Sequence, residues 1–493
     1  NHLPRGPDHR RHVSAHGRDE LGRGGGVHDR AHRPDRADQQ AAQAFRLLGI
    51  LDAPDTSVPI AARLLDQPEA FTEELLELLV DAQLLQSPTP DRYRLHDLLR
   101  LFAREQSARD DPDPARLAAL ARVLDCYLAT ARQTSHLLQP TDSRRAGGPA
   151  DRASAMAVSD RASAVGWLDR EHANILALAQ HGATLPDQLA ACTVALARAL
   201  FWGMQIRAHY RDHETLGRLG VQVAQRLGDH RSYAHLLTDL GVISWRLGRF
   251  EATRMSLEQA LGVLNTLGDR DGQARALNTL GVVHLRQGRW QAARTCHEQA
   301  LRLFRDLGDR RGEAAVLGNL GSVAQELGEL AAAVTYHQQD LAVSREVGNR
   351  HGESQALANL GESLLRQDHW QTAIRSCEQA ITIAQELGDR DTEGWALNTR
   401  GEAHRRAGDL AHAVDDQQHA ITIARETGDQ SAEARALWRL GLVSRDLDQL
   451  QRARDHWQAA VAIFDELGAP QAQQVRRLLD AATGEETIVS GHD

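Results

Sequence analysis

Apolar residues between 231 and 470 recur at the spacing of amphipathic helices, and the whole pattern returns every 40 residues. Leucines stand three positions apart in the segments LNTLG and LANLG. Glycine marks each return twice. One series occupies positions 241, 281, 321, 361, 401 and 441, and the other occupies 228, 268, 308, 348, 388, 428 and 468. The alternation typical of strands is missing from this region, so the pattern predicts stacked helix pairs and an all-α fold.

Each unit follows one template: a glycine, a second glycine seven residues later, then alanines five and seven residues further on. Over six units, 20 of 24 positions match, and the exceptions are Thr253, Asp340, Asp368 and Asp448. We expect the first glycine and both alanines at close helix crossings, and the second glycine in a turn that requires a positive φ. The glycine that ends each unit should cap the second helix. The Asp or Asn after it should cap the next helix.

This template resembles the tetratricopeptide repeat, although the period of 40 residues exceeds the usual 34. The longer unit is similar to the repeats of kinesin light chains and of GoLoco-binding spindle-orientation proteins. The resemblance implies a superhelical solenoid. We assign it residues 191–470, with a degenerate first unit at 191–230, followed by a capping helix and frayed tail at 471–493.

Residues 41–107 predict a separate compact unit. Three amphipathic helices, a short hairpin formed by 84–86 and 93–95, and a final helix, HDLLRLFAREQ, are the elements of a winged helix. We interpret residues 108–190 as a helical linker. Residues 1–39 are rich in histidine, arginine and glycine and predict a disordered or non-native leader.

Composition excludes several classes of chemistry. All 57 basic residues are arginines, so no P-loop lysine or Schiff-base lysine exists, and no hydrolase or zinc-protease motif occurs. Four separated cysteines give no metal or disulfide framework, and the leader histidines lack ligand spacing. No apolar stretch is long enough to cross a membrane. We therefore expect a cytoplasmic, non-catalytic protein with no cofactor and no bound metal.

The third helix of the 41–107 unit, FTEELLELLVDAQ, would be the one to read DNA, yet it carries no basic residue. The unit holds 6 arginines against 11 acidic residues. Since phosphate contacts need the opposite sign, we expect no nucleic-acid partner. An alternative hypothesis for the whole chain is a transcriptional regulator that contacts DNA through this unit.

The segment RYRLHDLLR, residues 92–100, resembles the Met-His-Asp motif in the winged helix of NB-ARC signal-transduction ATPases, with Leu95 in place of the frequent methionine. The segment WLDREHANILAL, residues 167–178, is similar to the region before the repeats in actinobacterial antibiotic regulators of this class. The resemblance implies that His96 is the histidine that contacts the β-phosphate of ADP. No P-loop is present, so this role is latent here. The alternative is that His96 only caps or packs its helix.

Partner binding is expected on the concave face formed by the first helix of each unit. By analogy with the family, an arginine column and nearby asparagines line this groove: Arg246, Arg286, Arg366, Arg406, Asn278, Asn319, Asn359 and Asn398. The arginines can pair with an acidic peptide and the asparagines can hold its backbone. The alternative interpretation is a solvated charged face.

Together these features predict the protein-binding sensor arm of a signal-transduction regulator that lacks its nucleotide-binding domain. A free-standing adaptor is the alternative.

Overall fold

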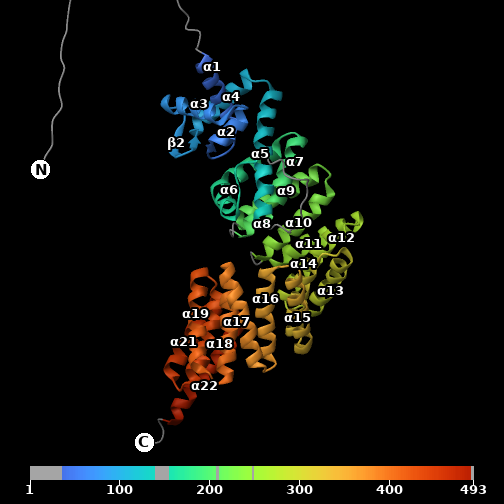
Figure 1. Cartoon of the computed structure of the whole chain (residues 1–493), viewed down its shortest axis with the longest axis vertical. Coiled ribbons are helices and arrows are strands. Elements are labelled where there is room, and N and C mark those ends of the chain that lie inside the picture. Colours follow the sequence, from blue (N-terminus) through green and yellow to red (C-terminus); the bar gives the residue numbers. More distant parts are fainter. Residues whose placement is uncertain (1–35, 139–154, 207–209, 247–248, 490–493) are drawn as a thin grey trace, which may run out of the picture.

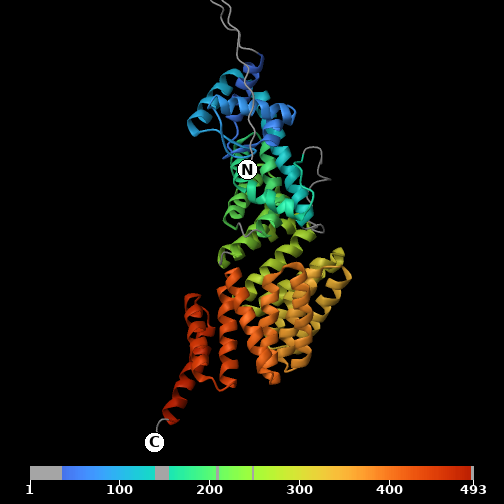
Figure 2. The ribbon, with the colours of Figure 1, turned by 60° about the vertical axis from the view of Figure 1, so that its left-hand side comes forward.

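The computed structural model describes residues 36–138, 155–206, 210–246 and 249–489. Most of the predicted leader and residues 139–154 of the predicted linker therefore lie outside the described residues, as does the side chain of Arg246. The chain runs from a small mixed unit through a helical middle region into the repeat array (Figure 1). A second view shows the same succession (Figure 2).

The N-terminal unit contains four helices and a three-stranded antiparallel sheet of order β1-β3-β2. Its elements are α1 (Arg36–Leu48), β1 (Thr56–Ser57), α2 (Val58–Leu65), α3 (Glu69–Asp81), β2 (Gln86–Thr89), β3 (Arg92–Arg94) and α4 (Asp97–Asp110). The sequence predicted β2 and β3 as a hairpin but not β1, because two residues before a helix give no strand periodicity. Strand β1 pairs Thr56 with Tyr93. The winged-helix assignment of this unit stays an interpretation.

The middle region is helical, as predicted. It consists of α5 (Asp113–Leu138), α6 (Arg161–Thr184), α7 (Asp187–Ala199), α8 (Phe201–Ile206) and α9 (Tyr210–Arg226). Buried residues of these helices form one continuous core with those of the N-terminal unit, from Ala44 to Leu236. The two segments that the sequence separates at residue 107 therefore share their hydrophobic interior.

A buried polar cluster reinforces this junction. The guanidinium of Arg92 on β3 donates to the carboxylates of Asp55 and Glu171. Glu171, on α6, also accepts hydrogen bonds from the Tyr127 hydroxyl at 2.6 Å and from the Asn174 amide at 2.9 Å. The same amide donates to Asp55 at 3.0 Å. Residues of the RYRLHDLLR and WLDREHANILAL segments thus meet directly, and Glu171 is only 3% exposed.

The repeat array is an all-α solenoid of paired helices, as predicted. The pairs are α10 (His230–Arg246) with α11 (Phe250–Leu267), α12 (Arg270–Arg286) with α13 (Trp290–Leu307), α14 (Arg310–Glu326) with α15 (Leu330–Glu346), α16 (Arg350–Arg366) with α17 (Trp370–Leu387), α18 (Arg390–Ala407) with α19 (Leu410–Thr427), and α20 (Gln430–Asp446) with α21 (Leu450–Glu466). Helix α22 (Gln471–Val489) packs against α21 and ends the array.

Capping chemistry explains where these helices begin and end. The residue after each unit-ending glycine accepts a hydrogen bond from the backbone N–H three positions later, at Asp269, Asp309, Asn349, Asp389 and Asp429. The unit-ending glycines have positive φ, as do the described turn glycines Gly288, Gly328 and Gly408 and the substitutes Asp368 and Asp448. These predictions are confirmed.

A side-chain contact explains the first glycine of each unit more specifically than the predicted close approach of two helix backbones. A Cβ at Gly281 would lie 2.6 Å from the ring of His297, and one at Gly441 would lie 2.3 Å from the indole nitrogen of Trp457. Both partners are buried in the second helix of the same unit, sixteen residues later. Glycine therefore makes room for a buried side chain of the second helix, which ranges in size from Cys377 beside Gly361 to Trp457.

Candidate ligand-binding face

The first helices of the repeats line the inner side of the array. Successive first helices contact one another, from α10·α12 to α18·α20, more closely than successive second helices do. Stronger evidence comes from side chains. Arg439 on α20 reaches Glu362 on α16 at 3.5 Å, past the intervening first helix α18. Only an inward curvature on this side brings such residues together, which agrees with the predicted concave face.

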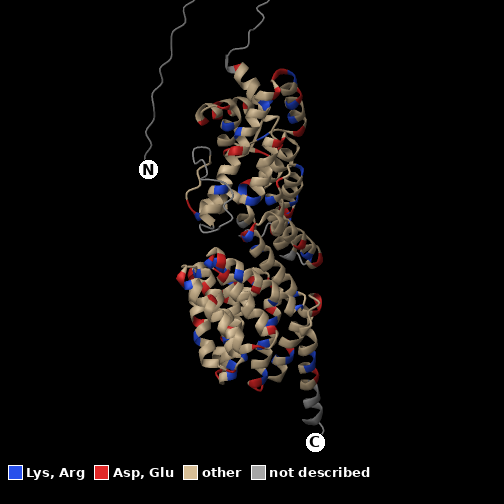
Figure 3. Cartoon of the chain, turned by 90° about the vertical axis from the view of Figure 1, so that its right-hand side faces the viewer, with Lys and Arg blue, Asp and Glu red and all other residues tan. Residues whose placement is uncertain are grey.

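We call the four positions at i, i+4, i+7 and i+11 of each first helix the inner face, because they recur on one side of a helix. In α12, α16, α18 and α20 these positions are Arg275, Thr279, Val282 and Arg286; Gln355, Asn359, Glu362 and Arg366; Trp395, Thr399, Glu402 and Arg406; and Arg435, Arg439, Leu442 and Asp446. Basic and acidic residues are interspersed over the array rather than gathered in one basic surface (Figure 3).

The predicted arginines Arg286, Arg366 and Arg406 lie on this face, and acidic residues neighbour Arg366 and Arg406. Arg366 is 3.5 Å from Glu362. Arg406 pairs with Glu402 at 2.9 Å and with Asp368 at 3.0 Å. Arg286 is exposed. Ion pairs within the chain therefore neutralise part of the positive charge that we expected to bind a ligand.

The predicted asparagines do not form one uniform row. Asn319 donates its amide to the Asn278 side chain at 2.9 Å, and the same Asn278 oxygen is 3.0 Å from the ring of His297. The Asn398 side chain accepts a hydrogen bond from Arg439. Asn359 is partly buried on α16. Three of these amides thus make contacts within the protein, which the sequence did not predict.

Arg435 and Arg439 are two inner-face residues that the sequence analysis did not name. We call equivalent positions 40 residues apart a column. The column of Arg435 also contains His235, Arg275, Ala315, Gln355 and Trp395. The column of Arg439 also contains Asp239, Thr279, Asn319, Asn359 and Thr399. The guanidinium carbon of Arg435 lies 4.8 Å from the centre of the Trp395 ring. The only available signal was their position 40 residues after Trp395 and Thr399, since neither series keeps one residue type along the array.

Burial and neighbouring charges shift the pKa values of two groups on the inner face, Glu362 and Arg435. Burial opposes ionisation of the Glu362 carboxyl, but Arg439 and Arg366 outweigh it and lower its pKa. Burial lowers the pKa of Arg435, and the nearby charges of Arg439 and Arg286 lower it further, whereas Asp429 and Glu362 raise it. The influence of Arg286 is informative because it belongs to α12, several repeats before α20.

His96 lies at the N-cap position of α4, with an exposed side chain that makes no capping hydrogen bond. The alternative that it caps its helix through the ring is therefore not supported. Leu98, Leu101 and Phe102 follow on α4 and are 72%, 61% and 51% exposed. Their spacing places them on one side of the helix. His96 thus adjoins an exposed apolar stripe.

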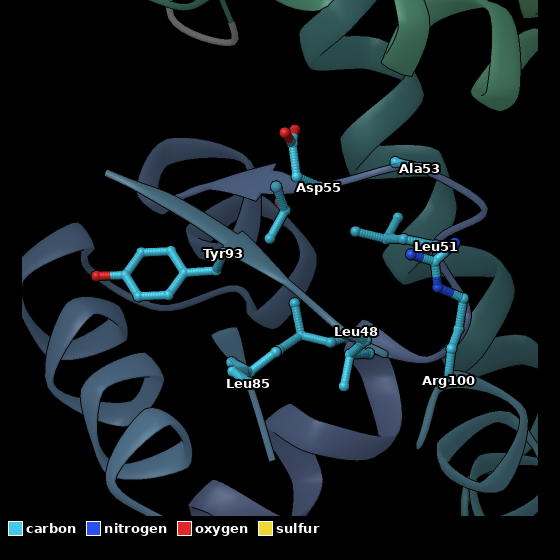
Figure 4. A pocket seen from close by; sticks show the side chains of 9 residues that line it. Leu48, Leu51, Ala53, Asp55, Leu85, Tyr93 and Arg100 are labelled. Carbon is cyan, nitrogen blue, oxygen red and sulfur yellow. The ribbon is translucent and has the colours of Figure 1, made fainter. Parts of the chain in front are cut away.

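A pocket in the N-terminal unit does not include His96. Leu48, Leu51 and Leu85 line it, with Asp55 and Arg100 at its sides (Figure 4). Most of its lining side chains belong to the hydrophobic core of the unit.

Three groups with metal-ligating atoms meet where α18 ends and α19 begins. His404, Asp409 and His412 bring these atoms within 4.8 Å of one another. Helix capping explains the arrangement: Asp409 accepts from the His412 backbone at 3.3 Å and contacts its ring at 2.7 Å. Among the described residues, no helix combines the length and apolar character needed to cross a membrane.

Comparisons with known proteins agree with this architecture. The tetratricopeptide repeat family matches residues 232–306, 272–346, 312–385 and 352–426. The chain is 36% identical over 220 residues to the regulatory protein AfsR of Streptomyces coelicolor, covering 43% of this chain and 21% of that protein. The identity to AfsR of Streptomyces griseus is 34% over 221 residues, covering 45% and 22%. The chain thus spans about a fifth of these relatives.

Solved structures with similar folds include a signal transduction ATPase with numerous domains and a tetratricopeptide repeat sensor, from Pyrococcus horikoshii. It shows 13% identity and a TM-score of 0.47, covering 89% of this chain and 65% of that one. A Rap protein complexed with competence and sporulation factor shows 14% identity and a TM-score of 0.46, covering 64% and 93%. The family match within residues 232–426 shows that the repeat array is of the tetratricopeptide type. The chain is similar to part of two bacterial regulatory proteins.

Proposed function

We propose that this chain is the sensor arm of a cytoplasmic signal-transduction regulator, and that the inner face of its repeats binds a protein or peptide. The observation that carries the proposal is the inward curvature that brings Glu362 and Arg439 together from α16 and α20. It concentrates arginine, asparagine and tryptophan side chains from several helices on one surface. The similarity to AfsR regulators supports the regulatory assignment. The proposal includes no catalytic step.

The exposed stripe of Leu98, Leu101 and Phe102 favours a sensor arm over a free-standing adaptor. Exposed apolar side chains at helical spacing are typical of a surface that another domain covers. Because the stripe adjoins His96, it fits an interface with a nucleotide-binding domain, as the NB-ARC resemblance implies. The acidic residues Glu73 and Glu74 are exposed on α3, which supports the expectation that this unit does not bind DNA.

Selection from a random dodecapeptide library displayed on phage tests the binding function. Enriched peptides, labelled with fluorescein, should bind the purified chain in a polarisation assay. Changing Arg286 and Arg366 together to glutamate should weaken binding at least about tenfold, because two favourable charge contacts become repulsive. Helicity and melting should change little, since both arginines are exposed.

The matched control is the double change of Arg302 and Arg375 to glutamate. Both residues are exposed on second helices, α13 and α17, so this variant has the same charge change away from the inner face. Equal weakening by both double variants would show a non-specific charge effect. Failure to enrich any peptide that binds the chain would contradict peptide binding.

A further inference from the structure

We infer that Arg435, stacked on Trp395, is the anchor on the inner face for one carboxylate of a peptide ligand. This inference rests on the proposed function, and it specifies the chemistry of the ligand at one position.

Among the charged inner-face arginines of α16, α18 and α20, Arg435 differs in its partners. Arg366 contacts Glu362, and Arg406 contacts Glu402. Arg439 contacts Glu362 and the Asn398 side chain. Arg435 has no carboxylate at ion-pair distance within the described part of the chain, and its contact is with the Trp395 ring, 4.8 Å away.

The surroundings of Arg435 favour the arrival of a negative charge. The side chain is partly buried, and burial of a guanidinium without a carboxylate is unfavourable. Burial and the positive charges of Arg439 on α20 and Arg286 on α12 lower the pKa of Arg435, and the carboxylates of Asp429 and Glu362 offset this only in part. A carboxylate bound at this position would offset the cost of burying the charged guanidinium and the positive potential around it. The planar guanidinium can bind it with two parallel hydrogen bonds.

Two features favour a single carboxylate on a peptide over a phosphate group. Glu362 is close enough to act on Arg435 electrostatically, and Glu402 lies in the same face, so a dianion would be repelled more than a monoanion. Trp395 is 39% exposed and offers an apolar surface beside the charge. The Asn359 amide lies on α16 in the next row of the inner face and is available to a peptide backbone.

Three fluorescein-labelled decapeptide pools test this inference on the full chain. All have uncharged random positions, and the central residue is glutamate, glutamine or phosphoserine. The parent chain should bind the glutamate pool about tenfold tighter than the glutamine pool, as expected for charge-assisted hydrogen bonds. Arg435→Gln should abolish that preference. Arg375→Gln should keep it, because Arg375 is exposed on α17, where it donates a hydrogen bond to Thr372 on the same helix.

Arg435→Lys keeps the charge without the planar donor pair and should give an intermediate preference, so the test survives if the glutamine variant folds poorly. Equal binding of the glutamate and glutamine pools, or a preference that survives Arg435→Gln, would overturn the inference. Tighter binding of the phosphoserine pool would overturn the assignment to a carboxylate. Absence of binding by every pool would also overturn it, while the phage selection described above tests the binding scaffold separately.

Discussion

Asp340 offers a sharp test of the energetics of the array, because it stands where most other units have a buried alanine. Its side chain is on α15 and only 7% of the residue is exposed. Oδ1 accepts a hydrogen bond from Ser344 at 3.1 Å, and Oδ2 occupies the space where a Cβ on Gly318 would lie, 2.8 Å away. Burial raises the pKa of Asp340 from 3.8 to about 7, although the bond from Ser344 opposes this change.

The sign of the resulting pH dependence follows from proton linkage. Between the two pKa values the folded protein holds a proton that the unfolded chain has released, so stability falls as the pH rises from about 4 to about 7. The difference between the two pKa values corresponds to on the order of 4 kcal/mol at higher pH. Asp340→Asn keeps the shape and the acceptor oxygen without the charge. It should stabilise the chain by about 2–4 kcal/mol at pH 8 and by about 1–2 kcal/mol at pH 5.

Urea unfolding followed by circular dichroism at both pH values measures this difference. Because repeat arrays open in parts, amide hydrogen exchange in α15 provides the local comparison. Asp415→Asn is the control, since Asp415 is exposed on α19. If Asp340→Asn lowers stability at pH 8, the ionised carboxylate stabilises its site and the argument from burial is wrong.

Two further substitutions test the packing. Glu171→Ala removes the acceptor shared by Arg92, Tyr127 and Asn174. It should destabilise the N-terminal and middle regions by about 3–5 kcal/mol in thermal or urea unfolding. If the loss is no larger than that of Glu298→Ala, a change at an exposed residue, the cluster has no structural role. Gly441→Ala should cost about 1–3 kcal/mol because its Cβ would overlap the Trp457 ring. Gly262→Ala should stabilise by about 0.5–1 kcal/mol, since its surroundings are open and exposed. Equal effects of the two glycine changes would refute this explanation.

The sequence was sufficient to predict the repeat array because its signals are local. A glycine at Gly268 and an aspartate at Asp269 each fix a helix boundary through backbone conformation or one capping bond, and periodicity repeats the same information in every unit. Strand β1 was missed because two residues carry no periodicity. The core shared across residue 107 was missed because its contacts join segments distant in sequence.

The candidate site could be predicted only to the level of a face. Sequence columns identified Arg286, Arg366 and Arg406 as neighbours on the first helices, but not which of them have partners. The contact between Asn278 and Asn319 joins residues from different columns, 41 positions apart. The contact between Arg439 and Glu362 depends on the curvature accumulated over two repeats. The repeat template in the sequence contains neither these side-chain contacts nor the curvature of the array.

The division between template and inner face explains where specificity can reside. Glycines and alanines at 20 of the 24 template positions hold successive helix pairs at a similar geometry, so the chemistry of these positions is the same in most units. The inner-face positions are under no such constraint, and one column changes from His235 through Gln355 to Trp395 and Arg435. A constant curvature therefore presents a different side chain at each step along a bound ligand. Because a tryptophan followed by an arginine occurs at one step of this column, a carboxylate on the ligand has one preferred register.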